Sequence, residues 1–217
     1  AGVVDGDLLL AFILRADDDG TTGITHASWN GFLNASSSTG NDRRLTGNRR
    51  IAASEPASYT FTNDAAASIN MAGIMLAIAA PLGIATTDSV DANTAGTHTS
   101  NDFTPAMPAL TVVRSGVIVT AIHGASMDNG VTGKTGGAPS GMTLVDYIES
   151  VAGAAFGAFI EVAYQENVAA GAFGTAAWTG TADDSTSEAT CANQSWKTQQ
   201  VFAPPPTLAA VHQAANW

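Results

Sequence analysis

Short apolar runs alternate along the whole chain with stretches rich in Gly, Asn, Asp, Ser and Pro. The run Leu8–Leu14 follows an Asp-Gly-Asp turn, and Ser58–Thr62 (SYTFT) alternates polar and aromatic side chains, as a half-buried strand does. Apolar runs of this length, bounded by turn residues, are typical of antiparallel sheets rather than of βα units. The pattern predicts strands within 8–14, 30–35, 49–53, 58–62, 69–78, 110–122, 141–150, 154–166, 172–179 and 188–202.

The two halves of the chain resemble each other at an offset of about 110 residues. The matching pairs are Asp5–Leu14 with Arg114–His123, Ile51–Thr62 with Val162–Thr179, and Ile69–Ile78 with Glu188–Thr198. We therefore expect an all-β fold: one antiparallel, jelly-roll-like β-sandwich over residues 1–203. Two similar four-strand halves, about 1–80 and 106–203, would form it.

Two segments depart from the strand pattern. Residues 81–105 are polar and rich in Thr, which predicts a long crossover loop, and loops of that length are often functional. Residues 204–217 form a Pro-rich tail, because three prolines end the last strand. A short helix in this tail could dock on a neighbour through Leu208, Val211 and Trp217, or the terminus could be frayed.

The totals limit the classes of partner. A chain of 217 residues suits one large all-β domain, and its single cysteine, Cys191, excludes an intrachain disulfide. The net charge of −11 repels phosphate backbones and disfavours nucleic acid as a partner. The apolar runs are too short or too interrupted to cross a membrane, and Asp5 and Asp7 precede the first run where a signal peptide would carry positive charge.

One basic cluster stands out in this acidic chain. Half of the eight basic residues lie within RRLTGNRR, at Arg43, Arg44, Arg49 and Arg50. They are candidates for an ionic contact with an acidic neighbouring surface, although a hairpin whose charges lie in solvent is the favoured interpretation.

Catalytic patterns are weak. None of the four histidines lies in a Gly-x-Ser-x-Gly motif, and His98 has only Ser100 and Asp102 close by on the predicted loop. His123 ends an apolar strand, and we interpret it as a hydrogen-bonded histidine at an edge rather than as a ligand. Strand alternation suggests that Glu149, Glu161 and Glu166 face solvent, so no enzyme activity is expected. We expect no cofactor either.

Two further sets of residues could contact ligands. Asp17, Asp18 and Asp19, followed by Gly20, are weak candidates for a Ca²⁺ site, since calcium prefers oxygen ligands, but a solvated hairpin tip is favoured. Trp178 and Trp196 lie in strand patterns and are expected in the core. Trp29 lies in a Gly/Asn-rich loop and is the candidate for stacking on a glycan.

Several pieces of the sequence, in order, resemble a family of uncharacterised β-sandwich proteins. They are Ala1–Ala11, Glu55–Thr62 (EPASYTFT), Asp91–Pro105, Gly116–Ile122 and Ala138–Tyr147. Members of this family occur among virion proteins of tailed phages, in prophages and among secreted bacterial proteins. The Pro-x-Gly-Trp-Thr turn common in the family is degenerate here, as HASWNGF and PSGMT. The family also carries a further strand before the matching start.

The resemblance implies a jelly-roll-like sandwich without known catalytic residues. It leads us to expect a non-enzymatic structural protein of a tailed-phage virion: a capsid decoration or cement protein, or a component of a head or tail fibre. Its partners would be other virion proteins and further copies of itself, in a trimer or on a lattice. The alternative is a carbohydrate-binding module of a secreted or adhesin protein, which predicts glycan binding through Trp29.

Overall fold

The computed structural model describes residues 3–16, 24–36, 44–62, 70–79, 90–98, 104–128, 135–150, 156–174, 176–180 and 189–196. All the elements that it defines there are β-strands, which confirms the predicted all-β class. The strands are β1 (Leu8–Ala16), β2 (Asn30–Ser36), β3 (Arg44–Ile51), β4 (Asn70–Ile78), β5 (Val90–His98), β6 (Leu110–Val112), β7 (Val117–Asp128), β8 (Thr143–Ser150), β9 (Phe156–Val168), β10 (Gly171–Phe173) and β11 (Ala189–Trp196).

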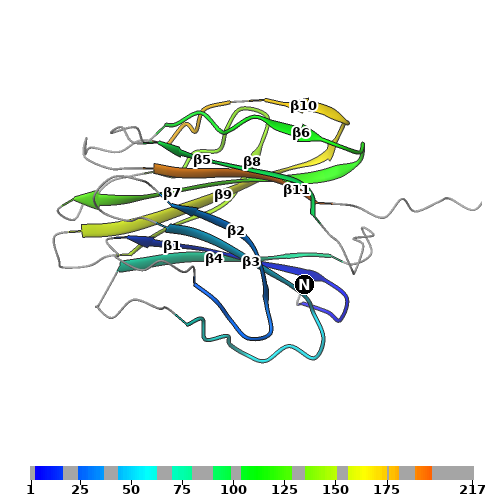
Figure 1. Ribbon diagram of the computed structural model, residues 1–217, viewed down its shortest axis with the longest axis vertical. Coiled ribbons are helices and arrows are strands. Elements are labelled where there is room, and N and C mark those ends of the chain that lie inside the picture. The colour runs from blue at the N-terminus through cyan, green and yellow to red at the C-terminus, as the bar shows by residue number, and fades with distance from the viewer. Residues whose placement is uncertain are drawn as a thin grey trace, which may run out of the picture.

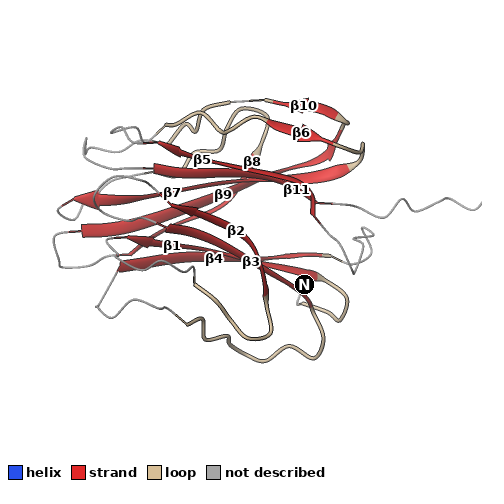
Figure 2. Cartoon of the chain, viewed as in Figure 1, coloured by secondary structure: helices blue, strands red, loops and turns tan. Residues whose placement is uncertain are grey.

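The strands form two facing antiparallel sheets and a small third layer (Figures 1 and 2). One sheet has four strands in the order β2-β3-β1-β4, and the other has five in the order β5-β11-β7-β9-β8. The two-stranded sheet of β6 and β10 lies beyond the five-stranded sheet, on the side away from the four-stranded one (Figure 1). The arrangement is a sandwich with one additional covering layer.

The main core lies between the two large sheets. Alternate residues of β1, among them Leu10, Phe12 and Leu14, point to this interface and meet Ile122 of β7 and Ile160 of β9. Phe32 bridges the layers, because its ring packs edge-on against both Phe12 and Trp196. The period of two along each strand thus explains why the run Leu8–Leu14 forms a strand with one face in the core.

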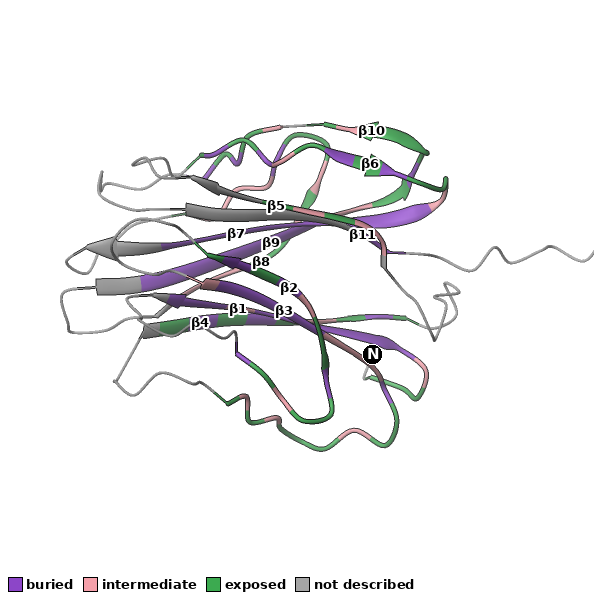
Figure 3. Ribbon diagram, viewed as in Figure 1, coloured by how far each residue is buried: buried purple, intermediate pink, exposed green. Residues whose placement is uncertain are grey.

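A second core covers the outer face of the five-stranded sheet. Val117 and Val119 of β7 pack there against Leu110 and Val112 of β6. Every residue from Val117 to Ala125 is therefore buried, as the continuous buried stretch of β7 in Figure 3 shows. A strand covered on both faces reads as a nearly continuous apolar run, and this segment is apolar apart from Thr120 and His123.

The two large sheets share an order of strands. If β1, β2, β3 and β4 are matched with β7, β8, β9 and β11, the sheet order β2-β3-β1-β4 is the same as β8-β9-β7-β11. In the second sheet, β5 adds a further strand beyond β11. The matching strands β2 and β8 each carry a β-bulge, between Gly31 and Leu33 in β2 and between Leu144 and Asp146 in β8.

Matching turns also precede the first strand of each set, β1 and β7. Gly6 before β1 and Gly116 before β7 both have positive φ, 95° and 80°, and their amides donate to the carbonyls of Ala52 (2.9 Å) and Val168 (2.8 Å). A further turn comes directly before each bulged strand. In these turns the amide of Trp29 donates to the carbonyl of His26, and the amide of Met142 donates to the carbonyl of Pro139, each at a distance of 3.0 Å.

Two predicted features are wrong. The Thr-rich crossover loop at 81–105 contains an edge strand, β5, because β-branched threonines suit a strand that is not buried on both faces. Ser58–Thr62 makes only an isolated bridge, Thr62 to Thr25, and runs across the outer face of the four-stranded sheet instead of joining it. The Pro-rich tail, 204–217, lies outside the described residues.

The packing of Phe12 makes a prediction about stability. Phe12→Ala removes a ring that is fully buried between the sheets, and we expect it to lower the free energy of unfolding by about 3–5 kcal/mol. Denaturant unfolding followed by circular dichroism measures the change. Val113→Ala, at a site that is 65% exposed, is the matched control and should change stability by less than about 0.5 kcal/mol. Equal effects of the two substitutions would contradict this packing.

Candidate functional site

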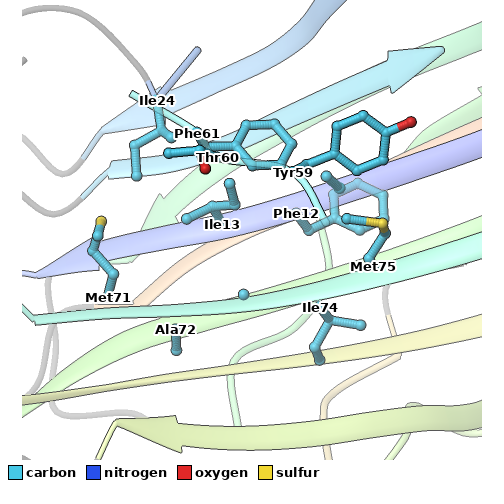
Figure 4. Close-up of a pocket in the computed structure, with 12 residues that line it drawn as sticks. Phe12, Ile13, Ile24, Tyr59, Thr60, Phe61, Met71, Ala72, Ile74 and Met75 are labelled. Carbon is cyan, nitrogen blue, oxygen red and sulfur yellow. The ribbon is translucent and has the colours of Figure 1, made fainter. Parts of the chain in front are cut away.

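An apolar groove of about 430 Å³ lies on the outer face of the four-stranded sheet (Figure 4). Its floor comes from β1 and β4 and its wall from the segment 59–61, which we call the aromatic arm. Figure 4 shows Met71 and Met75 projecting from β4 on the same side of the sheet as Tyr59 and Phe61, whereas Ile74 points the opposite way, into the core.

The aromatic arm is held against the sheet by a cluster of rings. Trp29 packs edge-on against Tyr59 at 5.1 Å and against Phe61 at 5.4 Å between ring centroids, and His26 contacts the same two rings. Leu9 of β1 lies beneath Trp29 in this cluster. The amides of Thr25 and Thr62 donate to each other's carbonyl oxygens and close the arm onto the segment that leads into β2.

The arm covers only part of the sheet. On β4, Met71 and Met75 are 44% and 50% exposed, and Gly73 between them leaves the floor of the groove low. None of the twelve lining residues is charged, and the lining hydroxyls belong to Tyr59 and Thr60. Such a surface suits an apolar side chain or strand of a partner better than a charged or strongly polar ligand.

The structure buries the tryptophan that was predicted to be exposed. Trp29 is only 6% exposed, because the aromatic arm lies over it, so the expectation of an open stacking platform is wrong. Trp178 and Trp196 are fully buried, as predicted, in two different clusters. The three described tryptophans thus lie under the arm, under the covering layer and between the large sheets.

Two described arginines of the basic cluster, Arg44 and Arg50, make contacts within the chain. Arg44 donates to Asn34 Oδ1 of the neighbouring strand at 3.0 Å. Arg50 pairs with Glu55 (3.1 Å), donates to Ser28 Oγ (3.0 Å) and lies 5.5 Å from the ring centroid of Tyr59. Arg50 therefore helps to fasten the aromatic arm.

The remaining candidates of the interface fall in two groups. Arg49 is half-buried on β3. Arg43, Leu208, Val211 and Trp217 lie outside the described residues, as do Asp17, Asp18 and Asp19.

A buried histidine–glutamate pair lies on the other side of the molecule, under the covering layer. His123 of β7 and Glu161 of β9 face each other across the strands and are both fully buried. His123 Nδ1 lies 2.7 Å from Glu161 Oε1, and because a carboxylate only accepts, the proton of this bond belongs to Nδ1. The second oxygen, Oε2, accepts from the amide of Gly137 at 3.1 Å.

The surroundings of this pair are aromatic and tightly closed. The ring of Phe159 lies 5.1 Å and that of Trp178 5.6 Å from the ring of His123. Above the pair, Gly137 and Gly180 approach so closely that a Cβ on Gly137 would lie 2.5 Å from the amide nitrogen of Gly180. We call the loop around Gly137 the covering loop. Within the described residues, the pair joins this loop to the five-stranded sheet and is closed to solvent.

These findings correct two interpretations of the sequence. Glu161 does not face solvent, because the outer face of its sheet is covered, whereas Glu166 is exposed as expected. His123 lies in the central strand β7 and not at an edge, although the expected hydrogen-bond partner is present. The arrangement of His98 with Ser100 and Asp102 lies largely outside the described residues.

Tyr147 of β8 borders the same cluster. Its ring lies 5.9 Å from that of Phe159, and it is paired across the strands with Glu161. Burial, reinforced by the carboxylates of Glu149 and Glu161, raises the pKa of the Tyr147 phenol far above its usual value.

The structure and its comparisons give no further identification of this site. The described residues contain no group of three or more His, Cys, Asp or Glu side chains placed to hold a metal ion. Among them there is also no helix long and apolar enough to span a membrane. No family model, curated protein or solved structure matches the chain.

Removing the carboxylate of the buried pair should destabilise the fold. Glu161→Ala leaves His123 and the Gly137 amide without a buried acceptor, and we expect a loss of about 3–5 kcal/mol in unfolding free energy. Hydrogen exchange at Gly137 should also accelerate. Glu166→Ala, an exposed glutamate on the same chain segment, is the control. Equal stability of the two variants would show that the pair does not hold the covering loop.

The raised pKa of Tyr147 should make the free energy of unfolding fall as the pH rises into the alkaline range. Its folded-state pKa is raised, so the unfolded chain releases the phenolic proton first, and the associated stability is complete below about pH 10 and declines as the pH rises further. Denaturant unfolding should show a steeper alkaline decline for the wild type than for Tyr147→Phe. Parallel declines would contradict the raised pKa.

Proposed function

We propose that the chain is a non-enzymatic structural protein of a tailed-phage particle, which acts through contacts with other virion proteins and with copies of itself. A capsid decoration or cement protein, or a component of a head or tail fibre, fits this role. The observation that carries the proposal is the open, uncharged groove beside the exposed methionines of β4. The resemblance in sequence to virion sandwich proteins supplies the particle.

The chemistry of the groove supports a protein partner. Contiguous exposed apolar surface on a soluble chain marks a place where another surface binds. The chain carries a net charge of −11, yet the groove and all of β4 lack charged side chains. A contact made there brings no charged side chains of the groove or of β4 into the interface.

The alternative, a carbohydrate-binding module, receives less support. Sugars are held by several convergent hydrogen-bonding groups together with an exposed aromatic face, and the groove offers only the hydroxyls of Tyr59 and Thr60 among its side chains. Trp29, which would supply the aromatic face, is buried under the arm.

With this function we propose the jelly-roll-like architecture of two similar halves. Its support is the common strand order of the two large sheets, the bulge in β2 and in β8, and the glycine turns at Gly6 and Gly116. A duplicated sandwich presents two large faces, of which one is closed by β6 and β10 and the other is left partly open.

The proposal is tested on particles. Mass spectrometry of phage particles purified from a culture that carries this gene should detect the chain at a fixed ratio to the major capsid or tail protein. The neighbouring genes should encode capsid, portal or tail proteins. A chain found only in the particle-free fraction, beside genes of another kind, would refute the virion role. Antibody labelling of the particles in micrographs would then separate capsid from fibre.

A further inference from the structure

The four outer strands of the two large sheets are β2, β4, β5 and β8. An edge strand exposes backbone amides and carbonyls, and proteins protect such edges with charges, prolines or bulges. β2 and β8 each contain a bulge, and β8 also carries Asp146 and Glu149. β5 carries Asp91, which pairs with Arg114 and accepts from the amide of Val113.

β4 has none of these protections. Its sequence, NMAGIMLAI, contains no charged residue and no proline. It pairs with β1 from Asn70 to Ile78 without a shift in register, so the strand is regular along its whole length. No described strand pairs with its other edge.

The other sheet shows what such an edge can hold. In the common strand order, β11 takes the place of β4, and β5 pairs antiparallel with the outer edge of β11. The equivalent position beside β4 is not filled by any described strand. The pair of β5 and β11 is thus a precedent within this fold for an antiparallel strand at this position.

The sequence of β4 is complementary to itself. If two copies pair antiparallel about Ile74, Gly73 lies opposite Met75, Ala72 opposite Leu76, and Met71 opposite Ala77. On the outer face each methionine then meets a small residue, and on the core face Leu76 meets Ala72 while Ile74 meets Ile74 of the second copy. On the outer face, Met71 and Met75 of each copy would fill space beside the groove of its own sheet.

The surface beside this edge is largely apolar. A second cavity, of about 330 Å³, lies where β4 faces β8; its lining includes Leu76, Ile78 and Val145, together with one charged residue, Glu166. Val145 is 41% exposed although it is large and apolar. A second copy on the β4 edge would lie close to this cavity.

We propose that β4 is the self-association edge of this protein: β4 of one copy pairs antiparallel with β4 of a second copy across a twofold axis at Ile74, which joins the two four-stranded sheets into one continuous sheet. The contact is isologous, so it closes as a dimer. It does not depend on the virion role, because it concerns only the association of the chain with itself. Salt should strengthen it, since each acidic copy carries −11.

The first test uses the full 217-residue chain in sedimentation-velocity runs over a range of concentrations. The wild type should form a concentration-dependent dimer. Met75→Lys, at an exposed position, places two like charges on the diagonal across the new strand pair and should weaken dimerisation by about tenfold or more. Val113→Lys makes the same charge change at an exposed site away from β4 and should dimerise like the wild type. Circular dichroism confirms that each variant is folded.

The second test examines the register. In the proposed pair a lysine at position 75 of one copy lies opposite position 73 of the other, so mixing Met75→Lys with Gly73→Glu should restore a mixed dimer that neither variant forms alone. A Cβ on Gly73 would lie 3.4 Å or more from its neighbours, so the fold can accept the glutamate.

Three outcomes would overturn the proposal. They are a wild type that stays monomeric at all concentrations, a Met75→Lys variant that dimerises as strongly as Val113→Lys, and a mixture that fails to restore the dimer. In a monomer, slow hydrogen exchange along both edges of β4 would instead place another segment of the same chain on this edge. Because none of these measurements uses particles, the proposal can fail while the virion role stands, and the reverse also holds.

Discussion

The fold depends on the burial of β7 and β9 on both of their faces. These strands occupy the middle of the five-stranded sheet, and their side chains alternate between the main core and the layer under β6 and β10. Any hydrophilic group on the covered outer face must therefore find a partner inside the protein. His123 and Glu161 meet this requirement through their mutual hydrogen bond and through the amide of Gly137, which donates to Glu161. The hydrogen bond from Gly137 also positions the covering loop on the sheet.

The four-stranded sheet resolves the same constraint less completely. Its outer face is covered over β1 by Trp29, Tyr59 and Phe61, but the cover ends before β4. The two large sheets share an order of strands and differ in how far their outer faces and edges are closed. The open groove and the exposed methionines of β4 are therefore two aspects of one difference between the sheets.

The sequence could predict the elements whose pattern has one physical origin. Leu8–Leu14 and the segment around Val117 are strongly apolar and bounded by glycine turns, so β1 and β7 were expected where they occur. Alternation does not tell which face of a strand is covered, and for that reason Glu161 was placed in solvent. β5 was missed because a polar, Thr-rich edge strand has nearly the composition of a loop. Trp29 was expected to be exposed because the segment that covers it, the aromatic arm, is distant in the sequence.

The described tryptophans are distributed one to each apolar layer. Trp196 lies between the large sheets, Trp178 beneath the covering loop, and Trp29 beneath the aromatic arm. Their intrinsic fluorescence therefore reports on three separate environments within one chain. Variants that lack Trp217 and retain one of these three at a time would distinguish the detachment of the arm, the opening of the cover and the separation of the sheets as distinct spectroscopic events during unfolding.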